Sequence, residues 1–570
     1  MPRTPLFRAL QRSFRRARLA AETGRPADEI VEIVRESPGL TRRQLLGGTA
    51  AAAGLALVGC RPFAPPPSRQ ARSGGGPRVV IVGAGIAGLT AGYRLQQKGA
   101  SVRVFEGQDR AGGRMYSQRG FYPNDQVAEL GGELIDTTHV RIRQLAEELA
   151  IPLDDFVFDD LSLDLDVPFF DGRRLTETEV VRAFVPVSRR TAWDRATLAG
   201  GWVSYREPSG GERLDRTPLS QWLDGAGAEP WLRKLLDVAY TTEYGLETAE
   251  QSALNFLLLM DPNPLPFRIF GESDERFHVR GGNDLIPKAL AERLGDRVET
   301  GTRVEAVSRR PDGSYAVSVR RGASSETVDA DHVVIAVPFT LLRGEGGIRL
   351  DASLGIPEVQ LRAIRELGYG TNSKLMVGFA RRLWRTPELP YHSNGSTLTD
   401  LPYQLCWETS RLQPGASGIL TNFTGGRHGL EIGEGTPESQ AEKFARELDR
   451  VFPGVAAERL PGKQSRFLWP TFAWSRGSYT CYRPGQWTAF AGEEGRRVEN
   501  LHFAGEHTSE YAQGFMEGGC ESGERVAREI LGAAERAGLP DRLYHISSAV
   551  TGRWSEAPIG QAREARTCQP

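Results

Sequence analysis

The stretch "RVVIVGAGIAGLTAGYRLQQKGASVRVFEGQDRAGGRMYS", residues 78–117, decides the fold expected for this chain of 570 residues. It opens with a β-branched run, 78–82, which is typical of a buried parallel strand. A glycine-rich turn follows, and apolar residues at helical spacing then continue to Gly99, a suitable C-terminal cap. "SVRVFE" predicts a second strand, which ends at Glu106. This order of strand, turn, helix and strand predicts an α/β fold.

The turn has the G-x-G-x-x-G spacing of a dinucleotide-binding loop, formed by Gly83, Gly85 and Gly88. Glycines let the backbone approach a pyrophosphate, and the helix N-terminus offers free N–H groups and the positive end of its dipole. Glu106 ends the second strand at the distance from the glycines where a carboxylate can bind both hydroxyls of a ribose. The glycine spacing alone is a weak signal, but the complete order predicts a dinucleotide site.

The next stretch, "RAGGR" (110–114), has two glycines flanked by arginines. It resembles the second fingerprint of the flavin-containing amine oxidases, which NAD dehydrogenases lack. The resemblance continues in "ELGGELID" (129–136), in "GDRVETGTRVEAV" (295–307) and in the closing motif "LHFAGEHTSEYAQGFMEGGCESGERVAREIL" (501–531). With gaps it runs from about residue 78 to residue 531, so the chain is identified as similar to the flavin monoamine oxidase family.

This resemblance implies FAD as the cofactor and adds residues to its expected binding site. They are Arg114, Gly132, Val304 near the adenine, Glu506 near the ribityl or pyrophosphate, and Met516. A helix that opens at Gly514 would point its N-terminus at the flavin, where it would stabilise the negative charge of the reduced ring.

Three catalytic positions are also implied by the resemblance. Lys374 matches the lysine that holds a water against flavin N5, and Tyr479 and Phe515 match the two walls of an aromatic substrate cage. Some family members carry a cysteine linked to the flavin, whereas this chain has Ser478 at that position. We therefore expect non-covalent FAD.

The expected architecture is a Rossmann-like FAD-binding domain interleaved with a mixed α+β substrate domain, the amine oxidase fold. The FAD-binding domain would comprise residues 77–150, 275–340 and 465–535, and the substrate domain residues 151–274 and 341–464.

The expected reaction is the oxidation of a primary or secondary amine to an imine, with oxygen reduced to hydrogen peroxide. Glu133 and Asp136 follow the "LG" block where amino-acid oxidases often have an arginine, and acids there favour a cationic amine. Two alternatives stay open. One is an L-amino-acid oxidase or a tryptophan 2-monooxygenase type, with a carboxylate-binding arginine from elsewhere. The other is a flavin-binding protein without turnover.

Composition narrows the partners. The net charge of −1 gives no reason to expect nucleic acid, and five scattered cysteines without a CxxC pair predict neither a metal site nor a disulfide framework.

The N-terminal stretch "TRRQLLGGTAAAAGLALVGC" (41–60) resembles a twin-arginine export signal, because Arg42 and Arg43 precede a short apolar run. From Gly47 to Gly59 this run has 13 residues, fewer than the roughly 20 of a membrane-spanning helix. Residues 1–60 would then be a leader read by the twin-arginine translocase, and the protein would be exported with its cofactor. "LVGC" also resembles a lipoprotein box, with Cys60 as a lipid anchor. A linker at 61–76 follows, and the polar tail 540–570 has no assignment.

Overall fold

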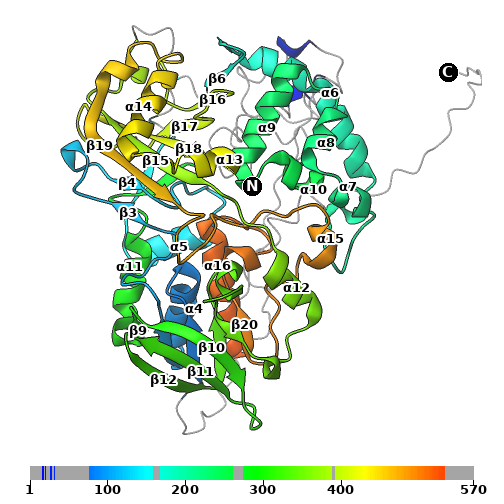
Figure 1. The fold of residues 1–570 in the computed structure, drawn as a ribbon, viewed down its shortest axis with the longest axis vertical. Coiled ribbons are helices and arrows are strands. Elements are labelled where there is room, and N and C mark those ends of the chain that lie inside the picture. The colour runs from blue at the N-terminus through cyan, green and yellow to red at the C-terminus, as the bar shows by residue number, and fades with distance from the viewer. Residues whose placement is uncertain are drawn as a thin grey trace, which may run out of the picture. The chain divides into compact units, whose positions relative to one another are not determined.

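A five-stranded parallel sheet organises one half of the molecule (Figure 1). The computed structural model describes residues 76–157, 159, 163, 167–260, 274–387 and 392–532, together with 16, 17, 20, 26–28 and 31. The strand order is β20 (Leu501–Phe503), β13 (His332–Ile335), β1 (Arg78–Val82), β2 (Ser101–Phe105) and β9 (Val298–Glu299). Neighbours in space thus come from three distant parts of the chain.

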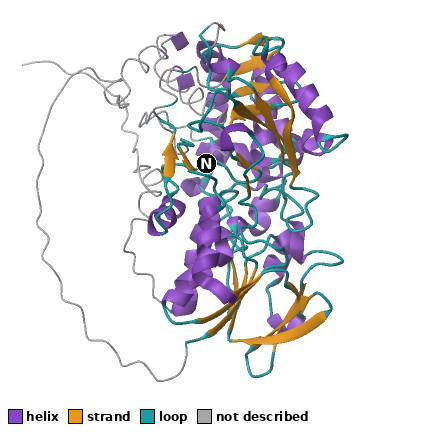
Figure 2. Ribbon diagram, turned by 90° about the vertical axis from the view of Figure 1, so that its left-hand side faces the viewer, coloured by secondary structure: helices purple, strands orange, loops and turns teal. Residues whose placement is uncertain are grey.

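Each face of this sheet packs against a different layer, because successive strand residues point to opposite sides. Val79 and Ile81 pack with apolar residues of the helices α4 (Ile86–Gln97), α11 (Leu285–Leu294) and α16 (Met516–Leu531). Val80 and Val82 belong to the core that includes a second sheet. The order of that sheet is β12 (Ser324–Ala330), β11 (Tyr315–Arg321), β10 (Arg303–Arg309) and β14 (Arg349–Leu350). Figure 2 shows the helices and this sheet on opposite sides of the parallel strands.

Glycine allows α4 and α16 to lie close together. A Cβ at Gly523 of α16 would stand 2.4 Å from the carbonyl oxygen of Ala87 in α4. The contact brings the last helix of the described chain against the first helix of the sheet. The N-terminal ends of both helices therefore belong to one small region.

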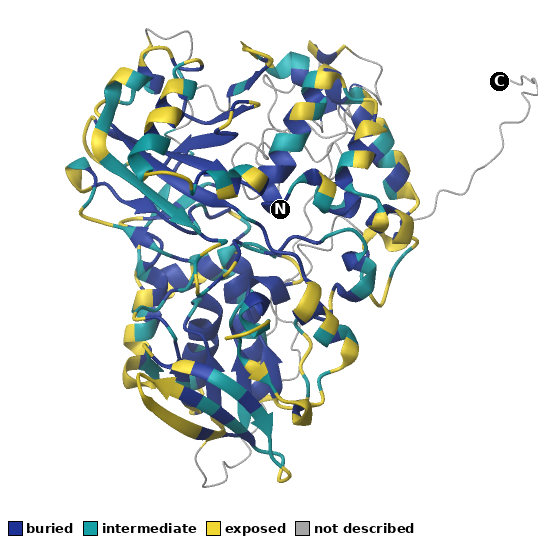
Figure 3. Ribbon diagram, viewed as in Figure 1, coloured by how far each residue is buried: buried dark blue, intermediate teal, exposed yellow. Residues whose placement is uncertain are grey.

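The other half is built on a seven-stranded, mostly antiparallel sheet with helices beside it. Its order is β19 (Arg459–Leu468), β15 (Ser373–Phe379), β18 (Gly418–Thr424), β17 (Leu405–Glu408), β16 (Thr397–Thr399), β6 (Val167–Phe170) and β7 (Arg173–Arg174). Every residue of β15, β17 and β18 is buried, as the dark blue strands of Figure 3 show. Such complete burial makes these strands a rigid support for side chains.

The remaining elements connect or cover these layers. The strands are β3 (Ser117–Gln118), β4 (Ala128–Glu129), β5 (Leu153–Asp155) and β8 (Phe277–Val279). The helices are α5 (Val140–Glu148), α6 (Glu177–Ala196), α7 (Glu212–Arg216), α8 (Leu219–Asp224), α9 (Pro230–Tyr244), α10 (Ala253–Leu259), α12 (Glu358–Glu366), α13 (Gly426–Glu431), α14 (Pro437–Leu448) and α15 (Gln486–Phe490).

The domain boundaries expected from the sequence can be compared with the positions of the strands in the two larger sheets. All five parallel strands fall within 77–150, 275–340 and 465–535, and six of the seven strands of the other sheet fall within 151–274 and 341–464. The seventh strand, β19, crosses the boundary expected between 464 and 465.

Part of the expected leader, 1–60, packs on the second half. Ala17, Ala27 and Val31 belong to the same apolar core as α6, α8, α9 and α10, and Arg16 pairs with Glu177 at the start of α6. Several parts of the sequence prediction lie outside the described residues: Arg42, Arg43, Cys60, the linker 61–76 up to residue 75, and the tail 540–570. Within the described part of the chain, none of the helices combines the length and the apolar character needed to cross a bilayer.

Candidate active site

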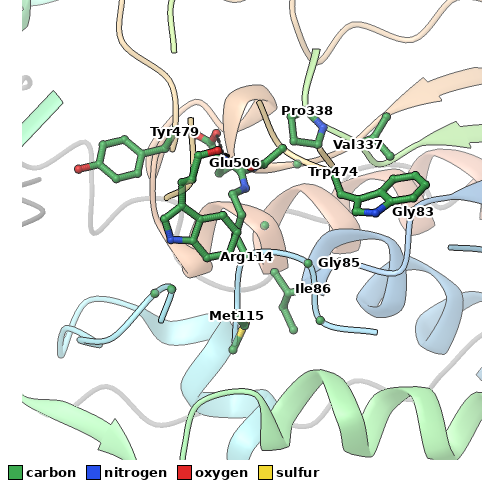
Figure 4. Close-up of a pocket in the computed structure, with 18 of the residues that line it drawn as sticks. Gly83, Gly85, Ile86, Arg114, Met115, Val337, Pro338, Trp474, Tyr479 and Glu506 are labelled. Carbon is green, nitrogen blue, oxygen red and sulfur yellow. Dashed lines mark hydrogen bonds and ion pairs between the residues drawn. The ribbon is translucent and has the colours of Figure 1, made fainter. Parts of the chain in front are cut away.

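A cavity of about 340 Å³ is lined by residues of both halves (Figure 4). One end is formed by the glycine loop after β1 and by the end of β2. The other is formed by side chains of β15, β17 and β18. The cavity thus joins the predicted dinucleotide site to the most completely buried strands of the second half.

Each of the three glycines of the loop is required by a different feature of the structure. Gly83 has a φ of +102°, which side chains rarely allow. A Cβ at Gly88 would stand 2.1 Å from the carbonyl oxygen of Gly83, so Gly88 sets the approach of α4 to the loop. A Cβ at Gly85 would meet no atom within 4 Å, and Gly85 lines the cavity. Gly85 therefore keeps space open for a ligand, whereas Gly88 lies beneath the cavity and serves packing.

The second glycine pair is joined to this loop. Gly112 N donates to the carbonyl oxygen of Ala84 at 2.8 Å, and a Cβ at Gly113 would stand 3.2 Å from the Cα of Gly85. The two fingerprints found in the sequence thus form a single backbone surface at this end of the cavity.

Glu106 is buried and lines the same end. Its two carboxylate oxygens accept the backbone N–H groups of Ala84, at 2.8 Å, and of Gln108, at 2.9 Å. Burial raises the pKa of Glu106, although these hydrogen bonds oppose the shift. The carboxylate is therefore fixed in place with lone pairs left to accept further donors.

Two helix N-termini face the cavity without a side-chain cap. Gly85 caps α4 and Phe515 caps α16, and neither makes a side-chain capping hydrogen bond. Gly85, Ile86, Phe515 and Met516 line the cavity. The positive ends of two helices of 12 and 16 residues thus point into one enclosed space, which favours a ligand with negative charge.

Arg114 and Glu506 form an ion pair at the wall between the two ends, with 2.9 Å between Nη1 and Oε1. Arg114 Nη1 also donates to the Ser478 carbonyl oxygen at 2.7 Å. The second oxygen of Glu506 accepts from Thr480 and from the backbone N–H of Gly514. Glu506 therefore connects the segment after β19 to the loop that leads into α16.

Lys374 extends from β15 into the far end of the cavity and is buried. Its Nζ donates to the Gly131 carbonyl oxygen at 2.8 Å, to the Glu129 carbonyl oxygen at 3.2 Å and to Glu133 Oε2 at 2.7 Å. Burial alone would raise the pKa of Glu133, but Lys374 and the hydrogen-bond donors around the carboxylate hold it below its ordinary value.

This contact changes the interpretation of the acids after the "LG" block. Glu133 is paired with Lys374, and Asp136 accepts the backbone N–H of Glu275 and pairs with His139. Neither carboxylate is free to attract a cationic amine, so the sequence argument for a cationic substrate from these acids was wrong.

Aromatic side chains surround Lys374. The predicted cage residues Tyr479 and Phe515 both line the cavity, together with Trp407 and Phe423 from the neighbouring strands. The Tyr479 hydroxyl donates to the Thr242 carbonyl oxygen at 3.4 Å, and the Phe515 ring lies 5.0 Å from that of His139. The far end thus combines these aromatic rings with the Lys374–Glu133 pair.

The structure brings the predicted site residues together. Every one of them lines the cavity except Gly88, including Gly132, Val304 and Met516, which the resemblance alone suggested. The shape fits FAD: Gly85 leaves room at the glycine loop, Glu106 offers a fixed acceptor, and two uncapped helix ends face the same space.

Comparison with known proteins agrees with this geometry. The sequence profile of "Flavin containing amine oxidoreductase" matches residues 86–531, which is most of the chain. The chain belongs to this flavin amine oxidase family. It is therefore an oxidoreductase whose cofactor is FAD. The alternative of a flavin-binding protein without turnover loses its support.

Curated relatives of this chain are distant but cover most of it. An L-amino acid dehydrogenase of Synechocystis is 26% identical over 80% of this chain and 94% of its own length. An L-amino-acid oxidase of Siganus canaliculatus is 25% identical over 79% of this chain and 85% of its own length. Human amine oxidase B is 25% identical over 80% of this chain and 86% of its own length.

Solved structures share the fold. Cyclohexylamine oxidase from Brevibacterium oxydans has a TM-score of 0.67 at 22% identity, covering 80% of this chain and 99% of its own. Wild-type putrescine oxidase bound to putrescine has a TM-score of 0.66 at 21% identity, with the same coverage. The predicted amine oxidase fold is confirmed.

Sequence reasoning missed several residues that line the cavity. Trp474 lies against Gly107, where a Cβ would stand 2.1 Å from its ring, and Asn372 accepts the Ser478 hydroxyl at 2.7 Å. Trp407 was missed as well. Trp474 stands shortly before Ser478 in the sequence, so it could have been noticed. Nothing in the sequence near Trp407 signals its role.

Proposed function

We propose that the protein oxidises a small primary or secondary amine to an imine and passes the electrons to oxygen, forming hydrogen peroxide. The observation that carries this proposal is the single cavity that joins the FAD-binding loops to an aromatic end around the buried Lys374. The imine would leave and hydrolyse, so that a primary amine, oxygen and water yield an aldehyde or ketone, ammonia and hydrogen peroxide. A secondary amine would release a primary amine in place of ammonia, and an amino acid would give a keto acid.

When bound, FAD supplies the acceptor for the two electrons and the hydrogen of the substrate α-carbon. The loops at Gly83–Gly88, Glu106 and the Arg114–Glu506 pair would hold it. Tyr479, Phe515, Trp407 and Phe423 would exclude water and orient the amine, which must be neutral to react. Lys374 would hold a fixed positive charge at the wall where these aromatic side chains meet.

A second candidate is the oxidation of L-amino acids, as the names of two relatives suggest. It requires a cation for the substrate carboxylate. The arginines among the described lining residues are Arg114, Arg303 and Arg476. Arg114 pairs with Glu506, Arg303 adjoins Val304, and Arg476 reaches the same place as Arg303, beside Gly346. Lys374 is engaged by Glu133. This arrangement favours an amine without a carboxylate.

The deciding experiment is a peroxide-release screen with purified enzyme over monoamines, polyamines and the L-amino acids. Anaerobic bleaching of the flavin absorbance by each compound is recorded in parallel, so that a dehydrogenase that reacts poorly with oxygen is still detected. We expect turnover with amines that lack a carboxylate. Turnover confined to L-amino acids would establish the second candidate, and bleaching without peroxide would overturn the assignment of oxygen as acceptor.

We also propose that the protein leaves the cytoplasm through the twin-arginine route with FAD already bound. The support is the Arg42–Arg43 pair before a short apolar run, and the need to fold around FAD before transport. Cys60 offers a lipid attachment point on the same segment.

A further inference from the structure

The ammonium group of Lys374 donates to three protein acceptors, so the water that the resemblance places between it and the flavin would share a hydrogen that is already engaged. A protonated lysine offers three N–H donors, and Nζ reaches three acceptors: the carbonyl oxygens of Glu129 and Gly131 and the carboxylate of Glu133. A neutral amine could satisfy at most two of them. The geometry is therefore that of a lysine held as a cation with its direction fixed.

Glu133 is held just as firmly. While its Oε2 accepts from Lys374, its Oε1 accepts the indole N–H of Trp407 at 2.9 Å and the hydroxyl of Thr409 at 2.8 Å. Glu133 follows β4, and Trp407 belongs to β17, so the pair joins elements that are far apart in sequence. Both charged side chains are only 5% exposed. A buried pair of this kind is strongly sensitive to the loss of one partner.

We propose that Glu133 is a positioning residue of the reaction: its carboxylate fixes the ammonium group of Lys374 at one point of the cavity wall. The inference rests on the proposed amine oxidation, and it adds a residue that acts through Lys374 without touching the substrate. Within the pair, the charges of Lys374 and Glu133 cancel, so that the pair itself adds no net charge to the aromatic end of the cavity.

Other titratable groups line or adjoin the same cavity. The Glu129 carboxylate accepts from Ser117 and contacts His278. Across the cavity, Arg114 and Glu506 pair with each other. Asp136 pairs with His139, and Glu275, which also lines the cavity, donates its backbone N–H to Asp136. Glu133 is the carboxylate in direct contact with the Lys374 ammonium among the described residues.

The test compares Glu133→Gln with a matched control, Glu408→Gln. Glu408 is also a buried carboxylate that accepts a tryptophan indole, from Trp384, and pairs with arginine, but it does not line the cavity. For each FAD-loaded protein, one amine that reduces the wild-type flavin is used as the substrate, and the rate of anaerobic flavin reduction is measured from pH 6 to pH 10. Each rate is divided by the wild-type rate at the same pH. This ratio cancels the titration of the substrate amine. Thermal melting is measured with and without FAD.

We expect both variants to melt at least ~3 °C lower than wild type, because each removes a buried carboxylate from an ion pair. Only Glu133→Gln should lower the rate ratio tenfold or more at every pH, since Lys374 then loses the carboxylate that fixes its direction. A rate ratio for Glu133→Gln equal to that of Glu408→Gln would overturn the proposal and leave Glu133 a structural residue.

A second comparison keeps the proposal testable if Glu133→Gln fails to fold. Lys374→Met leaves a buried anion, so the double variant Lys374→Met/Glu133→Gln should melt higher than Lys374→Met alone. Additive losses in melting temperature would contradict a coupled pair. If the wild-type flavin is reduced by none of the amines or amino acids, the proposed function fails, while the melting comparison still decides whether the pair exists.

Discussion

Glu494 makes the stability of the protein depend on pH near neutrality. It is buried, with 2% of its surface exposed, and it accepts the Tyr482 hydroxyl at 2.7 Å and the Gly492 N–H at 2.8 Å. Burial, the largest effect, raises the pKa of Glu494 to about 7, against those hydrogen bonds. A raised pKa means that the folded protein binds the proton more tightly than the unfolded chain. The stabilisation is therefore complete below pH 4.5 and is lost as the pH rises through 7.

We expect Glu494→Gln to remove this dependence. Between pH 4.5 and pH 8 the wild type should lose roughly 3 kcal/mol of unfolding free energy relative to the variant, at about 1.4 kcal/mol per pKa unit. Urea unfolding at several pH values measures the difference, and subtracting the two proteins cancels the other titrating groups. Parallel curves for the two proteins would contradict a neutral Glu494.

Ser478 decides how FAD is attached. It lines the cavity, its hydroxyl donates to Asn372, and neither cysteine nor histidine is among the described lining residues. With no thiol or imidazole available there, precipitation with acid should release yellow FAD into the supernatant. Absorbance of supernatant and pellet measures the partition, and adding FAD back to protein stripped under mild conditions should restore the bound spectrum. Flavin that migrates with the denatured chain would show a covalent bond.

At the scale of an element, the loop between β1 and α4 separates ligand binding from folding. An alanine at Gly85 would project into the cavity without touching protein, whereas one at Gly88 would press on the Gly83 carbonyl oxygen at 2.1 Å. Gly85→Ala should therefore weaken FAD binding tenfold or more and leave the melting temperature of the FAD-free protein unchanged. Gly88→Ala should lower both. Titration of apoprotein by flavin fluorescence, with melting curves of the same samples, measures the two effects. Equal loss of apoprotein stability in both variants would contradict the distinction.

The elements around this loop could be predicted because their signals are local. The strands 78–82 and 101–105, the glycine turn and the helix between them follow one another directly in the sequence and agree with the structure. The resemblance supplied the distant cavity residues, such as Val304 and Glu506.

The contact between Lys374 and Glu133 could not be predicted, because it joins residues 241 apart through the pairing of two halves. Reading Glu133 as a free acid failed for that reason: its charge is determined by a partner that only the assembled fold supplies. The position of β19 across a domain boundary has a similar origin, since pairing with β15 sets its length.

At the scale of the whole molecule, the expected export depends on Arg42 and Arg43. Changing both to lysine keeps the charge, and we expect the protein to remain in the cytoplasm with FAD bound. Fractionation followed by immunoblotting measures the distribution. The matched control changes Arg320 and Arg321, at the exposed end of β11, to lysine and should be exported as the wild type is. Unchanged fractionation of the first variant would show that the segment is no twin-arginine signal.

Because the parallel sheet is built from distant parts of the chain, the FAD pocket can be completed only late in synthesis. Gly83 and Gly85 are synthesised early, but the pocket they belong to also needs Glu506 and the first turn of α16, close to the end of the described chain. At ~5–20 residues per second, a ribosome takes roughly 20–80 s to cover that distance. During this interval the nascent chain contains the glycine loop but lacks Glu506 and α16, which line the same cavity. Its parallel sheet also lacks β20. We therefore expect FAD to bind late, after α16 has been synthesised, and we expect a chain that ends before residue 501 to lose the cofactor.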